Sequence, residues 1–365
     1  MKIVVACGGT GGHAFPGLAV AEELRRRGHE VTIWSSGRDV ESSVMLAWEG
    51  PIFSTYARQL SLRNIFAIWR SIRRCTWEMK RTRPDVLLAM GSYSSLPPVL
   101  AAKKCSVPVV LHEANAVPGR AVDFLSRCAR AVAISFEMTA KYLPGIKTVK
   151  TGLPVRSGIN RGKRFANIPA DAFTVFVTGG SQGAHMVNVL LSEALVLLDG
   201  ELRRRGGSGS RRLYVIHQTG AKDEGPIIAA YAAAGMDARV QSFEQEMADA
   251  FATADIVVAR AGASTCFELA ACAKPALLIP LPGALRNHQH HNAEQFAACG
   301  AADEGIQDKL SPHQLMRYLL SKYDHPEQLA AMGAKMAKLA VPDAAARVAD
   351  LVEKSARVDG VEQRR

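Results

Sequence analysis

Short apolar runs that end in glycine and polar residues constrain the fold of this chain more than any other feature. The clearest run, residues 256–259, is followed by Arg-Ala-Gly-Ala-Ser-Thr and then by a helical segment that carries Glu268. A second run, residues 276–279, ends in Pro-Leu-Pro-Gly. Continuous apolar runs of this length are typical of parallel strands covered on both faces. The polar residues after them then gather at the carboxyl edge of the sheet, where open α/β sheets bind ligands.

The helix after the first of these runs has the features of a phosphate and sugar site. Ser264 or Thr265 can cap it, and its first N–H groups and positive dipole end suit a phosphate. Glu268 lies about one turn inside and can accept hydrogen bonds from the hydroxyls of a ligand. A surface helix charge is the alternative, but the fixed distance from Ala-Gly-Ala-Ser-Thr favours ribose binding.

Glycine turns that open both halves of the chain predict two similar domains. Residues 2–6 form a first strand, Gly-Gly-Thr-Gly-Gly-His at 8–13 follows, and a helix is expected from near Pro16 to about Arg27. Residues 174–178 repeat the pattern and end in Gly-Gly-Ser-Gln-Gly. Bare backbone lets a ligand approach a helix N-terminus, so we interpret both turns as ligand contacts rather than only tight turns.

The length of 365 residues exceeds the usual size of a single core and also favours two α/β domains. We expect a first domain over residues 1–155 and a second over residues 156–340. The last segment, residues 341–365, is expected to form an Ala-rich helix followed by a polar tail. Its apolar face, with Val348, Leu351 and Val352, is expected to pack back on the first domain.

His13 is the candidate general base of the first domain. Two further loops, residues 91–95 and 112–115, follow strands of the same predicted sheet and should converge with residues 8–13 at its carboxyl edge. A lone histidine is often only a capping or packing residue. Its place in a glycine turn favours a functional role, because a neutral imidazole can accept a hydroxyl proton.

The formal charge of +11 favours anionic partners, and residues 58–83 concentrate that charge. Arginines and lysines there alternate with Ile65, Phe66, Trp69, Ile72 and Trp77. One interpretation places Ile65, Trp69 and Ile72 in the core with the arginines in solvent. The other is an amphipathic helix on an anionic membrane surface. A nucleic-acid-binding module would also use this segment, but the chain has no recognised motif of that kind.

The cysteines and histidines do not indicate a metal site. The seven cysteines include no C-x-x-C pair, as expected for a reducing compartment. His288, His290 and His291 do not share one helix face, so we reject a zinc site there. The start of the chain lacks the apolar core of a signal peptide and no run approaches a membrane span, so a soluble or peripheral protein is expected.

With these motifs assembled, the chain resembles the MurG family of glycosyltransferases over nearly its whole length. Members of that family move N-acetylglucosamine from its UDP carrier to the undecaprenyl-pyrophosphoryl muramoyl-pentapeptide of peptidoglycan synthesis. The segments that carry the resemblance are Gly-Gly-Thr-Gly-Gly-His-Ala-Phe-Pro-Gly at 8–17, His-Glu-Ala-Asn at 112–115, Gly-Leu-Pro-Val-Arg at 152–156, Gly-Gly-Ser-Gln-Gly-Ala at 179–184, Ala-Gly-Ala at 261–263 with Glu268, and His-Gln at 288–289 with Asn-Ala at 292–293.

The resemblance implies the glycosyltransferase-B fold, with two facing Rossmann-like domains of parallel sheets. The C-terminal domain would bind the UDP-sugar, and the N-terminal domain the lipid acceptor. His13 would be the catalytic base, Glu268 would bind the ribose, and Phe243 and Glu244 would lie by the uracil. The substrate-binding residues implied are Thr10, Gly11, Gly12, Asn115, Arg156, Ser181, Phe243, Glu244, Ala263, Ser264, Thr265, Cys266, Phe267, Glu268 and Gln289.

The resemblance also implies partners and a location. The partners would be UDP-N-acetylglucosamine, the undecaprenyl-linked lipid acceptor, an anionic membrane surface and other proteins of cell-wall synthesis, with no nucleic acid, cofactor or metal. The protein would be peripheral on the cytoplasmic face of the cell (inner) membrane.

The sequence departs from the family pattern at four positions. Ala114 stands where Gln is usual, Ser92 replaces a Gly, Ala261 replaces a common Ser, and Glu244 replaces an apolar residue. An NADP-dependent oxidoreductase built on the first glycine turn remains the alternative function, because Gly9, Gly11 and Ala14 match the loose dinucleotide pattern.

Overall fold

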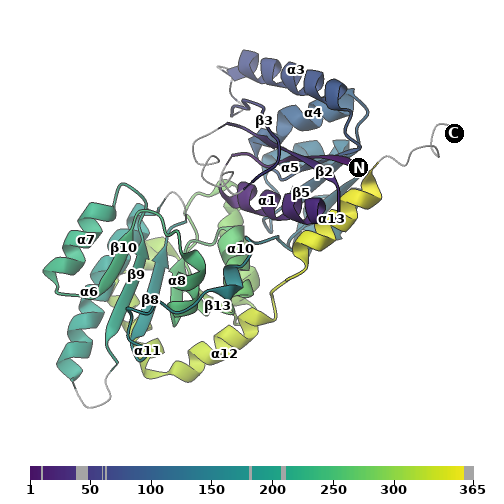
Figure 1. Ribbon diagram of the computed structural model, residues 1–365. Helices are drawn as coiled ribbons and strands as arrows, with labels where there is room; N and C mark the ends of the chain where they lie inside the picture. Colours follow the sequence, from purple (N-terminus) through teal and green to yellow (C-terminus); the bar gives the residue numbers. More distant parts are fainter. Residues whose placement is uncertain are drawn as a thin grey trace. The chain divides into compact units, whose positions relative to one another are not determined.

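The computed structural model describes residues 1–9, 11–37, 48–59, 61, 64–180, 183–206 and 211–356. The chain divides into two compact units: unit 1, Met1–Ser157 with Val341–Arg365, and unit 2, Gly158–Ala340. Each unit is an α/β layer structure around its own parallel sheet (Figure 1).

Unit 1 contains a seven-stranded parallel sheet in the order β3-β2-β1-β4-β5-β6-β7. The chain starts at the interior strand β1, adds β2 and β3 on one side, and then crosses to add β4 on the other. The strand order therefore reverses between β1 and β4, which is the switch point where such sheets bind ligands. The strands are β1 Lys2–Ala6, β2 Glu30–Ser35, β3 Ile52–Ser54, β4 Val86–Ala89, β5 Val109–Glu113, β6 Ala131–Ile134 and β7 Thr148–Lys150.

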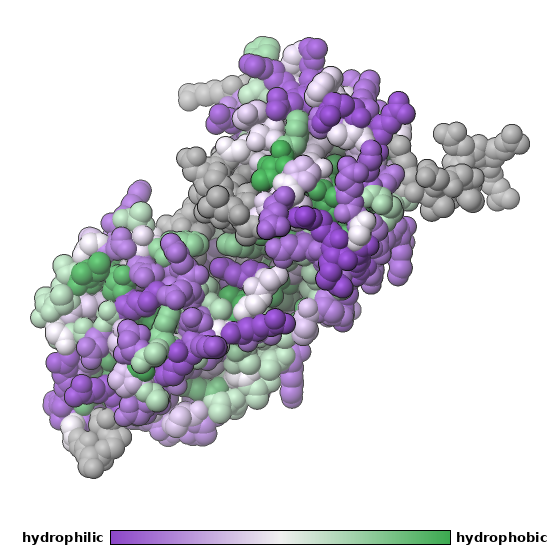
Figure 2. All heavy atoms as spheres, viewed as in Figure 1, coloured by the Kyte–Doolittle hydropathy of each residue, from purple (hydrophilic) through white to green (hydrophobic). Residues whose placement is uncertain are grey.

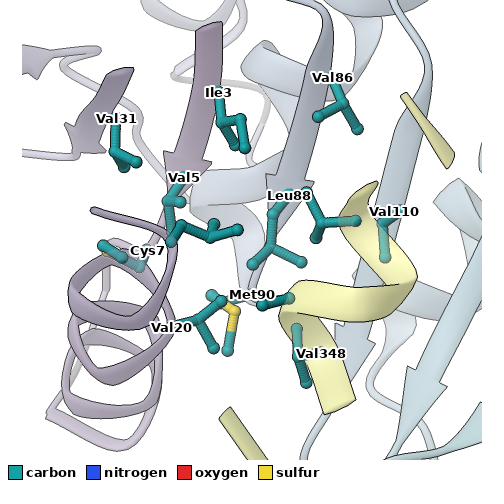
Figure 3. Close-up of a cluster of buried hydrophobic side chains, with 14 of the residues drawn as sticks. Ile3, Val5, Cys7, Val20, Val31, Val86, Leu88, Met90, Val110 and Val348 are labelled. Atoms are coloured by element: carbon teal, nitrogen blue, oxygen red, sulfur yellow. The ribbon is translucent and has the colours of Figure 1, made fainter. Parts of the chain in front are cut away.

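Helices cover both faces of this sheet because successive side chains of each strand point to opposite faces. Ile3 and Val5 of β1 pack with α1 and α13, and Figure 3 shows this layer, with Val20 of α1 and Val348 of α13 beside Met90. Val4 and Ala6 pack on the other face with α3 and α4. The helices are α1 Gly11–Arg26, α3 Ile65–Thr82, α4 Leu96–Lys104, α5 Arg120–Leu125 and α13 Ala344–Ser355.

Unit 2 repeats this plan with a six-stranded parallel sheet in the order β10-β9-β8-β11-β12-β13. Its switch point lies between β8 and β11. The strands are β8 Phe173–Thr178, β9 Leu213–Gln218, β10 Ala238–Gln241, β11 Ile256–Ala259, β12 Ala276–Leu278 and β13 Ala302–Glu304.

The core of unit 2 lies between its sheet and helices α6 and α11. Phe173, Val175 and Val177 of β8 point into this layer. Phe176 points to the other face, where its ring meets the ring of Phe251 edge-on at 5.5 Å. The helices are α6 His185–Arg205, α7 Glu224–Ala233, α8 Met247–Thr253, α9 Ala263–Ala271, α10 His288–Ala297, α11 Pro312–Asp324 and α12 Pro326–Ala337.

Helix α13 returns to unit 1 and lies alongside α1 (Figure 1). Its apolar residues Val348, Leu351 and Val352 are buried in the core of that unit. Arg27 holds it by contacts of 2.6 Å to Asp350 and 3.0 Å to Glu353. The predicted fold, two Rossmann-like parallel-sheet domains with a C-terminal helix on the first, is confirmed. The split after Ser157 lies two residues beyond the expected boundary.

Two predicted helix starts are wrong. Helix α1 begins at Gly11 rather than near Pro16, so His13 lies in its first turn and Pro16 lies inside the helix. Helix α9 has Gly262 at its N-cap, and neither Ser264 nor Thr265 caps it. In both helices a glycine stands at the start, where glycine is accepted more readily than in a helix interior.

Helix α3 does not bury the face that the core interpretation predicts. Ile65 and Trp69 are more than half exposed, and the buried side of the helix carries Ile68, Cys75 and Met79. The core interpretation is therefore wrong for Ile65 and Trp69. Ile72 is half-buried and packs against the core.

Candidate functional site

The switch point of unit 1 brings the three predicted polar loops together. Ala6 of β1 is in register with Ala89 of β4, and Ala89 with Leu111 of β5, so the residues after each strand start at the same level of the sheet. The Ser94 hydroxyl donates to the carbonyl of Gly8 over 2.6 Å, which ties the turn after β4 to the turn after β1.

Gly9 cannot be replaced by a larger residue without distorting this junction. Its φ is +115°, and a Cβ there would lie 2.7 Å from the Ser92 hydroxyl.

His13 is oriented by the turn after β4. Its Nδ1 lies 2.9 Å from the carbonyl oxygen of Met90. A carbonyl oxygen only accepts hydrogen bonds, so Nδ1 carries the proton in the neutral ring and Nε2 carries the lone pair. This tautomer is the one that a general base needs.

Glu113 holds the predicted site residue Asn115. The Oε1 atom accepts from the backbone N–H of Asn115 at 2.9 Å and from its side-chain amide at 3.1 Å, and Oε2 accepts from the N–H of Gly119 at 2.9 Å. The carboxyl is buried, and that burial raises the pKa of Glu113 above its usual range even though the donors act in the opposite direction. Glu113 was not among the predicted site residues, although it belongs to the His-Glu-Ala-Asn motif.

His112 is fully buried beside this group. Its Nε2 lies 3.3 Å from the carbonyl of Gly152, and burial lowers its pKa to about 4. The ring is therefore neutral at pH 7.

The remaining predicted residues of unit 1 lie around α1. Gly11 and Gly12 are its first two residues. The guanidinium of Arg156 stacks over the ring of Phe15 at 4.2 Å, so it is placed against the same helix as His13. Thr10, together with Ser181 of unit 2, lies outside the described residues.

At the switch point of unit 2, the last residues of four neighbouring strands lie side by side across the sheet. Thr178 of β8 is in register with Gln218 of β9 and with Ala259 of β11, and Gln218 is in register with Gln241 of β10. The loops after these four strands therefore start at one level of the carboxyl edge, with neighbouring strands about 4.8 Å apart.

The described ends of the glycine turn after β8 are closely fixed. Gly180 has a φ of +81°, and its N–H donates to the Thr178 hydroxyl over 3.1 Å. A Cβ at Gly183 would lie 2.2 Å from the carbonyl oxygen of Thr219, so only glycine fits there.

A buried polar network holds the loop after β9, which lies against Gly183. Asn188 of α6 donates to the Thr219 carbonyl at 2.8 Å and to Asp223 at 2.7 Å. His217 lies 3.2 Å from the Asn188 oxygen and 2.8 Å from the Tyr231 hydroxyl. Burial lowers the pKa of His217 to about 3, so the ring is neutral.

The predicted run after β11 forms the first two turns of α9. Ala263, Cys266, Phe267 and Glu268 are buried, and Ser264 and Thr265 are half-buried. Burial raises the pKa of Cys266 to about 12, so its thiol stays protonated. Ser264 and Glu268 are four residues apart and therefore share one helix face. The Glu268 side chain is buried despite its charge.

Glu244, in the segment after β10, forms an ion pair with Arg239 of β10 that the sequence did not predict. Glu244 is only 1% exposed, and Arg239 contacts both of its carboxylate oxygens, at 2.9 and 3.0 Å. Phe243 beside it is 41% exposed. The two predicted residues thus differ: the ring of Phe243 is available to a ligand, and the Glu244 side chain is turned to Arg239.

Arg260 and Gln289 both bond to the segment after β12. Arg260 is buried and donates to the carbonyls of Ile279 and Pro280 and to Gln307, and burial lowers its pKa. Gln289 accepts from the N–H of Leu281 at 3.0 Å. Arg260 was also not predicted as a site residue, although it follows a buried strand directly.

The histidines near α10 have separate carboxylate neighbours. His290 lies 2.6 Å from Glu304, and His291 lies 3.3 Å from Glu294. Within the described ranges, no three His, Cys, Asp or Glu side chains gather as a metal site would require.

Both units match family descriptions. Residues 3–134 match the glycosyltransferase family 28 N-terminal domain, and residues 174–348 match the glycosyltransferase family 28 C-terminal domain. Two relatives are each called UDP-N-acetylglucosamine–N-acetylmuramyl-(pentapeptide) pyrophosphoryl-undecaprenol N-acetylglucosamine transferase. The one from Geobacter sulfurreducens is 36% identical over 98% of this chain and 99% of its own length. The one from Myxococcus xanthus is 35% identical over 96% and 92%.

Solved structures agree with these matches. The crystal structure of Acinetobacter baumannii MurG has a TM-score of 0.76 and 30% identity, covering 97% of this chain and all of that one. A UDP-GlcNAc 2-epimerase from Neisseria meningitidis has a TM-score of 0.70 at 15% identity, which shows only the shared fold. The oxidoreductase alternative finds no support in these matches. The chain therefore belongs to glycosyltransferase family 28, in its MurG group.

Proposed function

We propose that the protein transfers N-acetylglucosamine from UDP-N-acetylglucosamine to undecaprenyl-pyrophosphoryl-N-acetylmuramoyl-pentapeptide, the step that makes lipid II from lipid I. The identity to named transferases over nearly the whole chain carries this proposal. The arrangement of each switch point supports it, because each ends in a glycine turn beside polar side chains.

Unit 2 would bind the donor. Glu268 would accept from the ribose hydroxyls, and the first N–H groups of α9 together with the turn after β8, with Ser181, would bind the pyrophosphate. Phe243 would lie against the uracil, and Gln289 would contact the sugar. The N–H groups of Gly11 and Gly12, with Thr10, and the side chains of Asn115 and Arg156 would complete the contacts to the nucleotide sugar.

The reaction requires a base and a stabilised leaving group. As the acceptor hydroxyl attacks the anomeric carbon, its proton passes to Nε2 of His13 while the bond to UDP breaks and negative charge grows on the pyrophosphate. N–H donors aimed at that charge stabilise it. Direct displacement inverts the configuration, from an α-linked donor to a β-linked product.

The test is transfer of labelled N-acetylglucosamine from UDP to a lipid-linked muramoyl-pentapeptide acceptor by the purified protein. We expect a β-linked product and, in titrations at matched salt, binding of UDP but not of NADPH. An α-linked product would reject the displacement mechanism. Binding of NADPH but not of UDP would favour the oxidoreductase alternative.

We also propose that α3 rests on an anionic membrane surface. Its solvent side carries Phe66, which is 79% exposed, and Trp69, which is 54% exposed. The Arg73 guanidinium lies 4.6 Å from the Trp69 ring. In Figure 2 hydrophilic and hydrophobic residues mix over this part of unit 1. Aromatic rings that enter the head-group region beside arginines favour such binding.

This attachment would be peripheral, on the cytoplasmic face of the inner membrane, where the lipid acceptor and other cell-wall proteins would be reached. No helix among the described residues has the length and apolarity that a membrane crossing requires.

Vesicle binding tests the α3 proposal. Replacing Phe66 and Trp69 with Ser, or Arg70, Arg73 and Arg74 with Glu, should release the protein from anionic vesicles. Ile228→Ser removes a comparably exposed apolar side chain from α7 of unit 2 and should leave binding unchanged. Binding that survives both α3 sets, or that ignores salt, would contradict the proposal.

A further inference from the structure

Gln218 connects two loops of the unit 2 switch point. It is the last residue of β9, is 1% exposed, and stands in register between Thr178 and Gln241. Its Nε2 donates to the carbonyl oxygen of Gly180 over 2.8 Å. Its Oε1 accepts from the backbone N–H of Glu244 over 3.3 Å. One side-chain amide thus bonds the main chain of both loops.

The direction of both bonds is fixed by their main-chain partners. The Gly180 carbonyl can only accept and the Glu244 N–H can only donate, so the amide must present its NH₂ to the first and its oxygen to the second. An ionised carboxylate of the same size matches only Glu244. A protonated carboxyl, with one donor and one acceptor, matches both.

Each loop also has hydrogen bonds of its own. The N–H of Gly180 donates to the Thr178 hydroxyl, and the Gly180 carbonyl accepts from the N–H of Gly183 over 3.0 Å as well as from Gln218. Glu244 is held by Arg239, and its Oε1 also accepts from the N–H of Glu246 at 2.9 Å. The ion pair with Arg239 therefore fixes the Glu244 side chain in the segment after β10.

We propose that Gln218 is a positioning residue that locks the turn after β8 to the segment after β10, so that the pyrophosphate and the base of the nucleotide are bound by loops that move as one. The inference rests on the proposed function, which assigns those two loops to UDP. Gln218 itself is not required to touch the ligand.

Two substitutions test the lock by calorimetric titration with UDP. Gln218→Met keeps the size of the side chain and removes both hydrogen bonds. We expect UDP affinity to fall about tenfold to a hundredfold, because the buried N–H of Glu244 loses its acceptor and the Gly180 carbonyl loses the bond that ties it to β9.

At pH 8 Gln218→Glu should weaken UDP binding by a similar factor. Burial raises the pKa of a carboxyl, so at pH 5.5 this side chain should be protonated. Its UDP affinity should then return to within about threefold of the wild-type value. Gln218→Met should show no such recovery. Each affinity is divided by the wild-type affinity at the same pH. This ratio cancels the effect on binding of protonating UDP or the neighbouring ionisable groups, which are His217, Asp223, Glu224, Arg239, Glu244 and Glu246.

A purely structural role predicts a different pattern. It would lower the thermal midpoint and leave the UDP affinity of the folded protein unchanged, with no pH-dependent recovery in Gln218→Glu. Gln328→Glu, on the exposed side of α12, is the matched control and should behave as the wild type at both pH values.

The outcomes separate this inference from the proposed function. If the wild type binds UDP and both Gln218 variants bind equally well, the lock is refuted and the function stands. If the wild type does not bind UDP, the function fails and the lock fails with it. If Gln218→Met does not fold, the ratio for Gln218→Glu at the two pH values decides alone.

Discussion

The two switch points share a backbone plan and differ in their chemistry. In unit 1 the carboxyl ends of β1, β4 and β5 bring together the ionisable side chains of His13, at the start of α1, and of His112 and Glu113, at the end of β5. In unit 2 the carboxyl ends of β8, β9 and β11 provide main-chain groups, the side chain of Gln218 at the end of β9, and the first turn of α9. The charges of Arg239 and Glu244 there neutralise each other.

The comparison shows how one topology serves two tasks. Parallel strands that end at one level place loops side by side in both units, whatever the loops contain. Proton transfer then needs a titratable group held in one tautomer, which Met90 provides for His13. Binding a pyrophosphate needs fixed N–H donors, which glycine turns and a helix start provide.

Replacing His13 should separate the two tasks most strongly. General-base loss typically lowers rates by ~10²–10⁴-fold, so His13→Ala should lower kcat by that order and leave UDP affinity nearly intact. Steady-state kinetics and UDP calorimetry measure the two effects. His29→Ala removes a histidine that pairs with Glu353 and should change neither. Near-normal turnover in His13→Ala would assign the base elsewhere.

Replacing Glu268 should give the opposite pattern. A carboxylate that accepts from two ribose hydroxyls gives charge-assisted hydrogen bonds worth roughly 1.5–3 kcal/mol, so Glu268→Ala should weaken UDP binding by that amount without unfolding the protein. Glu294→Ala, on an exposed position of α10, is the control. Unchanged UDP affinity by calorimetry would remove Glu268 from the nucleotide site.

Acid should act on unit 2 through His217. The folded-state pKa of about 3 lies below the ordinary 6.5, so the stability that this neutral ring contributes is present above pH 6.5 and is lost as the pH falls toward 3. The free energy of unfolding should fall by up to about 1.4 kcal/mol per pH unit in that window. Denaturant titrations followed by circular dichroism should show a smaller slope in His217→Gln; an unchanged slope would contradict the assignment.

The smallest effect is expected at Ser92 of unit 1. Its φ of 67° and ψ of 166° belong to a region that glycine almost alone occupies, at a cost of order 1–3 kcal/mol for other residues. Ser92→Gly should therefore stabilise unit 1 by about 1 kcal/mol, after the entropy that glycine adds to the unfolded chain. All four tryptophans lie in unit 1, so their fluorescence follows it. A lower unfolding midpoint would show that the serine hydroxyl outweighs the strain.

The sequence predicts the parts of this structure that depend on periodic burial. The strands, the glycine turns after β1 and β8, and the return of α13 follow from apolar runs and their endings. The family motifs correctly indicate the fold. The starts of α1 and α9 are misplaced because Pro16 and Ser264 are residues typical of helix starts, whereas α1 begins at Gly11 and α9 has Gly262 at its N-cap.

Contacts between strand ends could not be predicted. Nothing in the order of residues shows that Gln218 lies between Gly180 and Glu244, or that Arg239 turns back to Glu244 across the end of β10. The exposed side of α3 was also ambiguous, because Trp and Arg fit both a core edge and a surface. The buried side of α3 is decided by its packing on α4 and on the sheet, which the order of residues does not show.

Hydrogen–deuterium exchange on the full-length protein with saturating UDP tests the division of tasks most directly. We predict that the strongest protection falls in unit 2, at residues 176–180, 242–247 and 260–269, because these segments hold the nucleotide. The same segments should be unchanged by NADPH. Protection confined to residues 3–9 and 86–95 of unit 1, with none at residues 260–269, would contradict the account.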